Sequence, residues 1–264
     1  MSLALDGAGN LLILDQVNRR VQRFDRSGQL RGSLALTTDT AQDLLVDKDR
    51  VAVLDRLGLE PAVHLTDLDG QPLGKLDVVG GQISEGGAIT GLFADADGIY
   101  VETGHDDLVR VGSAQGQPTG LQETIPGRPS RDGRLYLKTG VIDKAAGRIF
   151  VQAHDRQKKL AWESALNLGR PLLHILLLDS DLAGNVYVAA EVGQEDPATH
   201  EMRDLATIVI RLEGTAGQLD AVLELPPTTV DPAETFRPLV LGDDGTLYQL
   251  LASPSGITVT AYHM

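Results

Sequence analysis

Short stretches of alternating apolar and polar residues run along the whole chain, and each is interrupted by a turn. The first, "LALDGAGNLLILD" at 3–15, reads as an apolar strand, an Asp/Gly/Asn turn and a second apolar strand. Because Gly and Asn accept the positive φ that tight hairpins require, this pattern predicts a β-hairpin. Apolar residues do not recur at the spacing of three and four that helices need, which excludes helical repeats.

Five later segments repeat the hairpin pattern. They are "DLLVDKDRVAVLD" at 43–55, "GLFADADGIYVET" at 91–103, "GVIDKAAGRIFVQ" at 140–152, "LLLDSDLAGNVYVAA" at 176–190 and "LVLGDDGTLYQLL" at 239–251. The spacing of roughly 40–60 residues suits propeller blades of four short strands. We therefore predict a single all-β domain over 1–264, a six-bladed β-propeller of degenerate repeats. The blades are expected at approximately 3–36, 43–80, 90–126, 132–172, 174–226 and 237–264.

The first blade is the most regular. Its strands are "LALD", "LLILD", "RVQRFD" and "LRGSLAL", and the continuous apolar run at 11–14 predicts a strand that is buried on both faces. The segment "LDGAGNLLILDQVNRRVQRFDRSGQL" resembles an NHL repeat, and the matching positions are Asp6, Gly9, Asn10, Asp15, Asn18, Arg20, Val21, Phe24, Asp25 and Gly28. The resemblance implies a six-bladed propeller of the NHL and lactonase-like kind, and it implies no particular chemistry.

The sixth hairpin is followed by "SPSGITVTAYHM", which supplies one more strand. We therefore predict that the last blade lacks its outer strand in this sequence. Because a free edge strand invites aggregation, we expect residues upstream of this sequence to complete the blade. A start at "MS" directly before a strand fits a trimmed chain, and no leader is present in the sequence.

Composition narrows the classes of partner. Lys and Arg total 23 against 37 acidic residues, a net charge of -14, which disfavours binding to a phosphate backbone. The run "ILLL" at 175–178 is far too short to span a bilayer, so we predict no direct membrane insertion. Cysteine is absent, which excludes disulfides and thiol chemistry. The Leu/Gly/Asp/Arg-rich composition suggests a bacterial protein, and we favour a periplasmic or extracellular location over a cytoplasmic one.

The connections between second and third strands vary most, and we predict the binding face there. Its candidate residues are Asp15, Asn18 and Arg19 in the first blade, Asp55 and Arg56 in the second, His105, Asp106 and Asp107 in the third, His154 and Asp155 in the fourth, and Glu191 and His200 in the fifth. The fifth connection, 191–207, is polar and broken by Pro197, which makes it a candidate contact loop.

Two features raise the question of a metal ion. His105 and His154 fall at nearly equivalent places in their blades, and paired imidazoles with flanking carboxylates could hold zinc. The turns "DADG", "DLDG" and "DSDLAGN" resemble pieces of calcium loops, although none supplies the full ligand set. We favour solvated loops and tight turns, and assign no cofactor and no metal.

Catalytic motifs are missing: there is no G-x-S-x-G elbow, phosphate-binding loop or dinucleotide fingerprint. Lactonases of the resembling family place polar residues where Thr103, Ala153, Ala190 and Leu251 stand here. Trp162 is expected to pack in the third strand of blade four, and His64, His174 and His263 in or beside strands. We predict a non-catalytic binding or scaffold module whose partner is another protein. The alternative is a metal-dependent lactonase- or lyase-like enzyme with an ion over the central channel.

Overall fold

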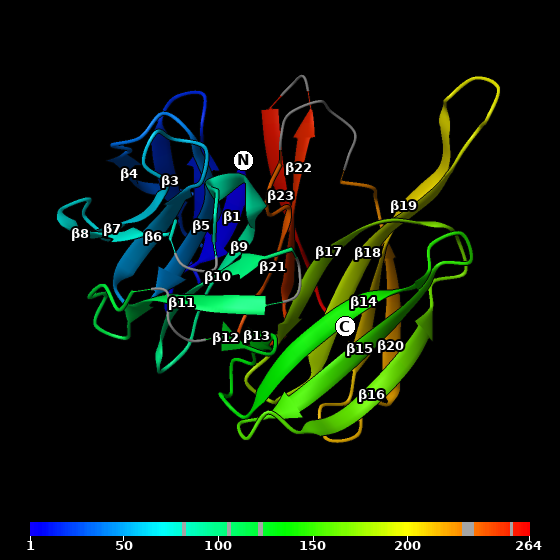
Figure 1. Cartoon of the computed structure of the whole chain (residues 1–264). Coiled ribbons are helices and arrows are strands. Elements are labelled where there is room, and N and C mark those ends of the chain that lie inside the picture. The colour runs from blue at the N-terminus through cyan, green and yellow to red at the C-terminus, as the bar shows by residue number, and fades with distance from the viewer. Residues whose placement is uncertain (81–82, 105–106, 121–123, 229–234, 254–255) are drawn as a thin grey trace. The chain divides into compact units, whose positions relative to one another are not determined.

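The computed structural model describes residues 1–264 except 81–82, 105–106, 121–123, 229–234 and 254–255. Within these residues the chain forms six antiparallel sheets and one 3-10 turn, η1 (Gly86–Ala88). Five sheets have four strands and the last has three. The six sheets, visible in Figure 1, are the blades of the predicted six-bladed β-propeller, so the predicted fold class is confirmed. No helix in this described part of the chain is long and apolar enough to cross a membrane.

The blades fall into two compact units of three sheets each. Unit 1 comprises Met1–Ile125 and Glu234–Arg237, and unit 2 comprises Pro126–Ala233 and Pro238–Met264. A short segment from late in the chain thus belongs to the unit formed by the first three blades.

Unit 1 holds the first three blades. From the innermost strand to the outermost, the first blade consists of β1 (Ser2–Leu5), β2 (Leu11–Asp15), β3 (Arg20–Phe24) and β4 (Leu30–Ala35). The second consists of β5 (Ala41–Asp47), β6 (Arg50–Asp55), β7 (Ala62–Asp67) and β8 (Pro72–Asp77). The third consists of β9 (Ile89–Ala94), β10 (Gly98–Thr103), β11 (Asp107–Ser113) and β12 (Thr124–Ile125).

Unit 2 holds the other three. The fourth blade consists of β13 (Arg128–Pro129), β14 (Leu135–Asp143), β15 (Arg148–Asp155) and β16 (Leu160–Asn167). The fifth consists of β17 (Leu172–Ser180), β18 (Val186–Glu195), β19 (Met202–Leu212) and β20 (Leu219–Leu225). The sixth consists of β21 (Leu239–Leu241), β22 (Leu247–Ser253) and β23 (Gly256–Tyr262). The last blade therefore has three strands, as its sequence predicted.

The first hairpin turn shows why the Asp-x-x-Gly-Asn sequence recurs. The Asp6 carboxylate accepts hydrogen bonds from the backbone N–H groups of Ala8 (2.9 Å) and Asn10 (2.8 Å), while Gly9 adopts a φ of +75°. Asp181 repeats this with Asn185, and Gly184 has a φ of +92°. The carboxylate folds the turn onto itself, and glycine supplies the left-handed residue.

Strand β6 shows how the core is shared between blades. Its side chains alternate: Val51 and Val53 pack in the cluster with the first sheet, and Ala52 and Leu54 pack in the cluster with the third. Strand β6 is thus buried on both faces, which explains its continuous apolar run.

The fourth blade differs from the prediction. The hairpin at 140–152 joins the second and third strands, β14 and β15, because a two-residue strand, β13, precedes them as the innermost strand. Trp162 therefore lies on the outermost strand, β16, and not on the third strand. It is buried, and its indole N–H donates to the Gly214 carbonyl at 2.7 Å. A two-residue strand carries too little periodicity to be found in a sequence.

The predicted contact loop 191–207 is also different. Most of it belongs to β18 and β19, which pair as far as Glu195 and Met202, so only 196–201 form the turn. The result is a long hairpin whose tip extends beyond its neighbouring strands (Figure 1). The polar residues there belong to the ends of two strands that are exposed, whereas the remainder of both strands is largely buried.

Candidate functional site

The connection between β2 and β3, residues 16–19, is held by Asp15. The Asp15 carboxylate accepts hydrogen bonds from the Asn18 side chain (2.8 Å) and from Arg20 Nε (2.9 Å). Burial alone would raise the pKa of Asp15, but these hydrogen bonds outweigh it and lower the pKa below its ordinary value. Two of the predicted binding residues, Asp15 and Asn18, therefore bind each other and fix the turn.

Asp55 does the same for the connection between β6 and β7, residues 56–61. Its carboxylate accepts hydrogen bonds from the hydroxyls of Thr38 and Thr40 and from the backbone N–H of Gly58. Although burial raises the pKa of Asp55, the hydrogen bonds lower it further than burial raises it. A Cβ at position 58 would lie 2.7 Å from an Asp55 carboxylate oxygen, so a larger residue there would push this carboxylate out of its present position.

Both connections contact the segment 36–41, which joins the first blade to the second. Gln16 Nε2 donates to the Ala41 carbonyl (2.6 Å), and the Arg19 guanidinium pairs with Asp39. Asp55 reaches the same segment through Thr38 and Thr40. The two turns are thereby braced against one shared segment, so they are presented on the same side of unit 1.

The tips of these braced turns are apolar, which the sequence analysis missed. Val17 is 91% exposed and Leu59 is 106% exposed, and Leu57 between them in sequence order is also exposed. We call Val17, Leu57 and Leu59 the turn-tip residues. The signal in the sequence was apolar residues among polar turn formers, one in "DQVNRR" and two in "DRLGLEP". Single exposed apolar residues are common on protein surfaces, and these three are distinguished by lying on turns that are braced by the Asp15 and Asp55 carboxylates.

Arg56 is anchored by the chain around it. Its backbone N–H donates to Gln42 Oε1 (2.9 Å), and its guanidinium donates to the Ile89 carbonyl (2.7 Å) and lies over the Phe236 ring at 5.2 Å. The side chain thus joins the second blade to the third and to the late segment of unit 1.

Only one member of the histidine pair, His154, lies among the described residues. His105 and Asp106 lie outside the described residues, and Asp107 begins β11. His154 lies within β15, and Asp155 ends that strand, where its carboxylate accepts hydrogen bonds from the N–H groups of Gln157 and Lys159 at 2.9 Å each. His154 and Asp155 therefore adjoin the turn between the third and fourth strands, not the connection predicted. The cause is the extra innermost strand β13.

Glu191 and His200 are also placed differently from one another. Glu191 is buried within β18, where it accepts hydrogen bonds from the Thr228 N–H (3.0 Å) and hydroxyl (3.2 Å). His200 lies in the exposed turn of the β18–β19 hairpin, with Nδ1 2.7 Å from a Glu195 carboxylate oxygen. Glu191 is thus structural, and His200 is the one of the two that is open to a partner.

Among the residues that the structure describes, no three His, Asp or Glu side chains form a group able to hold a metal ion. The carboxylates of Asp15 and Asp55 are occupied by their own turns, as described above. An ion of the metal-dependent alternative would therefore need ligands other than Asp15 and Asp55.

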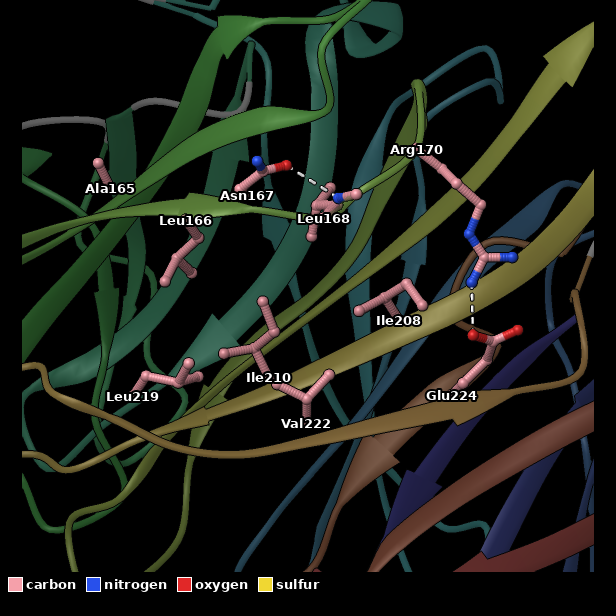
Figure 2. Close-up of a pocket in the computed structure, with 11 residues that line it drawn as sticks. Ala165, Leu166, Asn167, Leu168, Arg170, Ile208, Ile210, Leu219, Val222 and Glu224 are labelled. Carbon is pink, nitrogen blue, oxygen red and sulfur yellow. Dashed lines mark hydrogen bonds and ion pairs between the residues drawn. The ribbon is translucent and has the colours of Figure 1, made fainter.

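A second surface feature lies in unit 2, between β16 and the pair β19–β20. It is an open groove with a volume of about 570 Å³, shown in Figure 2. Its floor is apolar, with Leu166, Ile208 and Ile210, and Leu219 and Val222 stand exposed at its side. At one end Arg170 pairs with Glu224 at 2.5 Å. The groove offers apolar contact area, with a single neutralised charge pair.

Each unit also contains an arginine that joins its three blades. In unit 1 the Arg237 guanidinium donates to the buried Asp43 carboxylate (2.6 Å) and to the Leu92 carbonyl (2.8 Å). Asp43 also accepts from the Ser2 hydroxyl (2.7 Å), and the Arg237 carbonyl accepts from Leu3 N–H (3.1 Å). We call this the Arg237 joint.

In unit 2 the corresponding residue is Arg131, in the β13–β14 turn. Its guanidinium donates to Asp179 (2.8 Å), to Asp243 (2.9 Å) and to the Leu241 carbonyl, and its backbone N–H donates to Ser180 Oγ. Burial alone would lower the pKa of Arg131, but the two carboxylates outweigh it and raise the pKa. We call this the Arg131 joint. Neither joint was predicted from the sequence.

Comparison with known proteins supports the fold and leaves the family open. No family model and no curated protein matches the sequence. Among solved structures, virginiamycin B lyase from Staphylococcus aureus aligns with a TM-score of 0.51 at 9% identity, over 100% of this chain and 83% of that one. Hsv2 from Kluyvelomyces marxianus aligns with a TM-score of 0.50 at 14% identity, over 98% of this chain and 70% of that one. At such identities the likeness shows a propeller fold alone, and the resemblance to NHL repeats stays a prediction.

Proposed function

We propose that this chain is a non-catalytic β-propeller binding module that contacts another protein through the turn-tip residues. One observation carries the proposal: Val17, Leu57 and Leu59 are exposed on turns whose backbones are fixed by buried or half-buried carboxylates. Exposed apolar side chains on rigid turns lose little conformational entropy on binding, which favours affinity. Arg19 and Asp39 beside them supply a polar rim that a protein partner can complement.

The test compares two triple variants. Val17→Ser/Leu57→Ser/Leu59→Ser removes the turn-tip residues, and Leu30→Ser/Leu73→Ser/Val79→Ser removes three exposed apolar residues of the same unit that lie outside the two turns. Affinity purification with quantitative mass spectrometry is run on both variants and the unchanged chain, using extract from cells that express it. We expect the first variant to lose a specific partner by about tenfold or more, and the second to retain it.

Stability provides the control for this experiment. Each turn-tip substitution should change the free energy of unfolding by less than about 0.5 kcal/mol, because the side chains contact little of the core. Equal recovery of every partner by all three proteins would overturn the proposal. Stoichiometric zinc or calcium in the purified chain, lost on mutating His105 and His154, would instead support the metal-dependent alternative.

A further inference from the structure

The outermost strand of the sixth blade, β23, differs from the outermost strands of the other blades. The other strands of this position that are longer than two residues each carry a charged side chain: Arg31 in β4, Lys75 in β8, Glu163 in β16 and Asp220 in β20. Strand β23, "GITVTAY", has none and contains no proline. Charges and prolines on edge strands normally prevent pairing with another chain.

The pairing of β23 is also the most regular. The ladders β3–β4, β7–β8, β15–β16 and β19–β20 all contain a register shift, whereas β22–β23 pairs over seven consecutive residues without one. Bulges twist an edge away from a potential partner, so their absence leaves a straight edge. Within the described residues β23 pairs with β22 alone, and Ile257, Thr258 and Ala261 along it are exposed.

The sequence of β23 is nearly symmetric about Val259. A two-fold axis through Val259 would place Thr258 opposite Thr260 of a second copy, Ile257 opposite Ala261, and Val259 opposite itself. Residues directly opposite in an antiparallel pair share a face, so apolar residues would meet apolar ones and hydroxyls would meet hydroxyls. No like charges would be opposed, although each copy carries a net charge of -14.

We propose that β23 is a homodimerisation edge, which pairs antiparallel with β23 of a second copy and so extends the sheet of the sixth blade. A two-fold arrangement of this kind closes on itself and does not propagate into fibres. The paired edge is short, so the dimer should exchange with monomer. Because the copies repel each other through their net charge, added salt should strengthen the association. This inference concerns a different surface from the turn-tip residues and does not depend on the proposed function.

Sedimentation equilibrium of the purified 264-residue chain tests the proposal, with a charge-swap pair of variants. Thr258→Lys/Thr260→Lys and Thr258→Glu/Thr260→Glu each oppose like charges across the two-fold axis, and should raise the dimer dissociation constant by about tenfold or more. A one-to-one mixture of the two variants places lysine opposite glutamate and should restore dimers. The variant Gln29→Lys/Ser33→Lys adds the same charge to the outer edge of the first blade, and should dimerise at least as well as the unchanged chain.

Circular dichroism of each variant establishes that it is folded. Dimers in the unchanged chain, their loss in each β23 variant and their return in the mixture support the proposal. An unchanged chain that stays at 28.2 kDa at every concentration and salt overturns it. Variants that dimerise like the unchanged chain, or a mixture of folded variants that stays monomeric, overturn it equally.

Discussion

Units 1 and 2 solve the same structural problem, the joining of three sheets, with one arginine each. In unit 1 the arginine binds a single carboxylate that is 0% exposed, and its own side chain is 17% exposed. In unit 2 the arginine is 26% exposed and shares its charge between two carboxylates that retain contact with solvent. The Arg237 joint is thus less exposed to solvent and depends on one carboxylate, whereas the Arg131 joint is more exposed and has two carboxylates.

The two arginines also differ in how far along the sequence they lie from their carboxylate partners. Arg131 lies in the first turn of its own unit, 48 residues from Asp179. Arg237 lies 194 residues from Asp43, on a segment that reaches unit 1 after most of unit 2 has been traced. Unit 1 is therefore completed by a distant part of the chain, and unit 2 by a nearer one.

Among the substitutions that compare the two units, Arg237→Ala should reduce the free energy of unfolding most. The substitution leaves the Asp43 carboxylate buried without its cation, which should reduce the free energy of unfolding by about 3–5 kcal/mol. Urea unfolding followed by circular dichroism measures it. The double variant Arg237→Ala/Asp43→Asn should recover part of the loss, because the uncompensated charge is gone. A loss below about 1 kcal/mol for the single variant would contradict the importance of the Arg237 joint.

Arg131→Ala should reduce the free energy of unfolding by less than Arg237→Ala does. Asp179 and Asp243 can turn to water, so we expect a loss of about 1–3 kcal/mol, most of it from the unpaired Leu241 carbonyl and the lost cation. The single tryptophan, Trp162, lies in unit 2 and reports on this unit by its fluorescence. The comparison of the two joints is wrong if Arg131→Ala destabilises the chain more than Arg237→Ala does.

The two units should also differ, by a smaller amount, in the stability that each loses at acid pH. In unit 1 the pKa values of Asp6, Asp15 and Asp55 are lowered, because hydrogen bonds outweigh the burial that would raise them. Carboxyls with a lowered folded-state pKa contribute stability above their unfolded pKa, and this contribution is lost as the pH falls through the folded value. In unit 2 the pKa of Glu213 is lowered by hydrogen bonds from Thr215 and Ala216 within its own turn.

Stability should therefore fall below about pH 4, and unit 1 should be affected first. Circular dichroism, which reports on both units, should then lose signal before Trp162 fluorescence does. Asp55→Asn should remove part of this acid dependence while leaving the Trp162 signal unchanged at neutral pH. Coincident loss of both signals at each acid pH would mean that the two units do not differ in this way.

The fold could be predicted from the sequence because the determinants of a hairpin are local. Asp6, Gly9 and Asn10 build a turn from their own side chains and backbone, and β6 reveals its two buried faces by its continuous apolar run. The fourth blade was misaligned because its innermost strand, β13, is two residues long and lies beside a more regular hairpin. That one error placed His154 in a connection instead of in β15, and Trp162 on the third strand instead of on β16.

The candidate site was harder to predict because its residues act over long distances. Asp15 and Asp55 are at the predicted turns, yet their carboxylates are used to brace those turns. Asp43 interrupts an apolar run in "AQDLLVD", and nothing nearby in the sequence indicates that Arg237 is its partner. The turn-tip residues were overlooked because an isolated apolar residue in a turn has no periodicity with which to compare it.

The Arg237 joint also affects the order in which parts of unit 1 can fold while the chain is being synthesised. While the chain leaves the ribosome, the first three blades can form their hairpins, but the carboxylate of Asp43 waits for its cation until residue 237 has been synthesised. In unit 2 the order is reversed: Arg131 is synthesised first and can pair with Asp179 before Leu241 and Asp243 are made. The half of the protein that is synthesised first therefore lacks its Arg237 joint until most of the chain has been made, and during that interval a protease or chaperone would meet unit 1 without this contact.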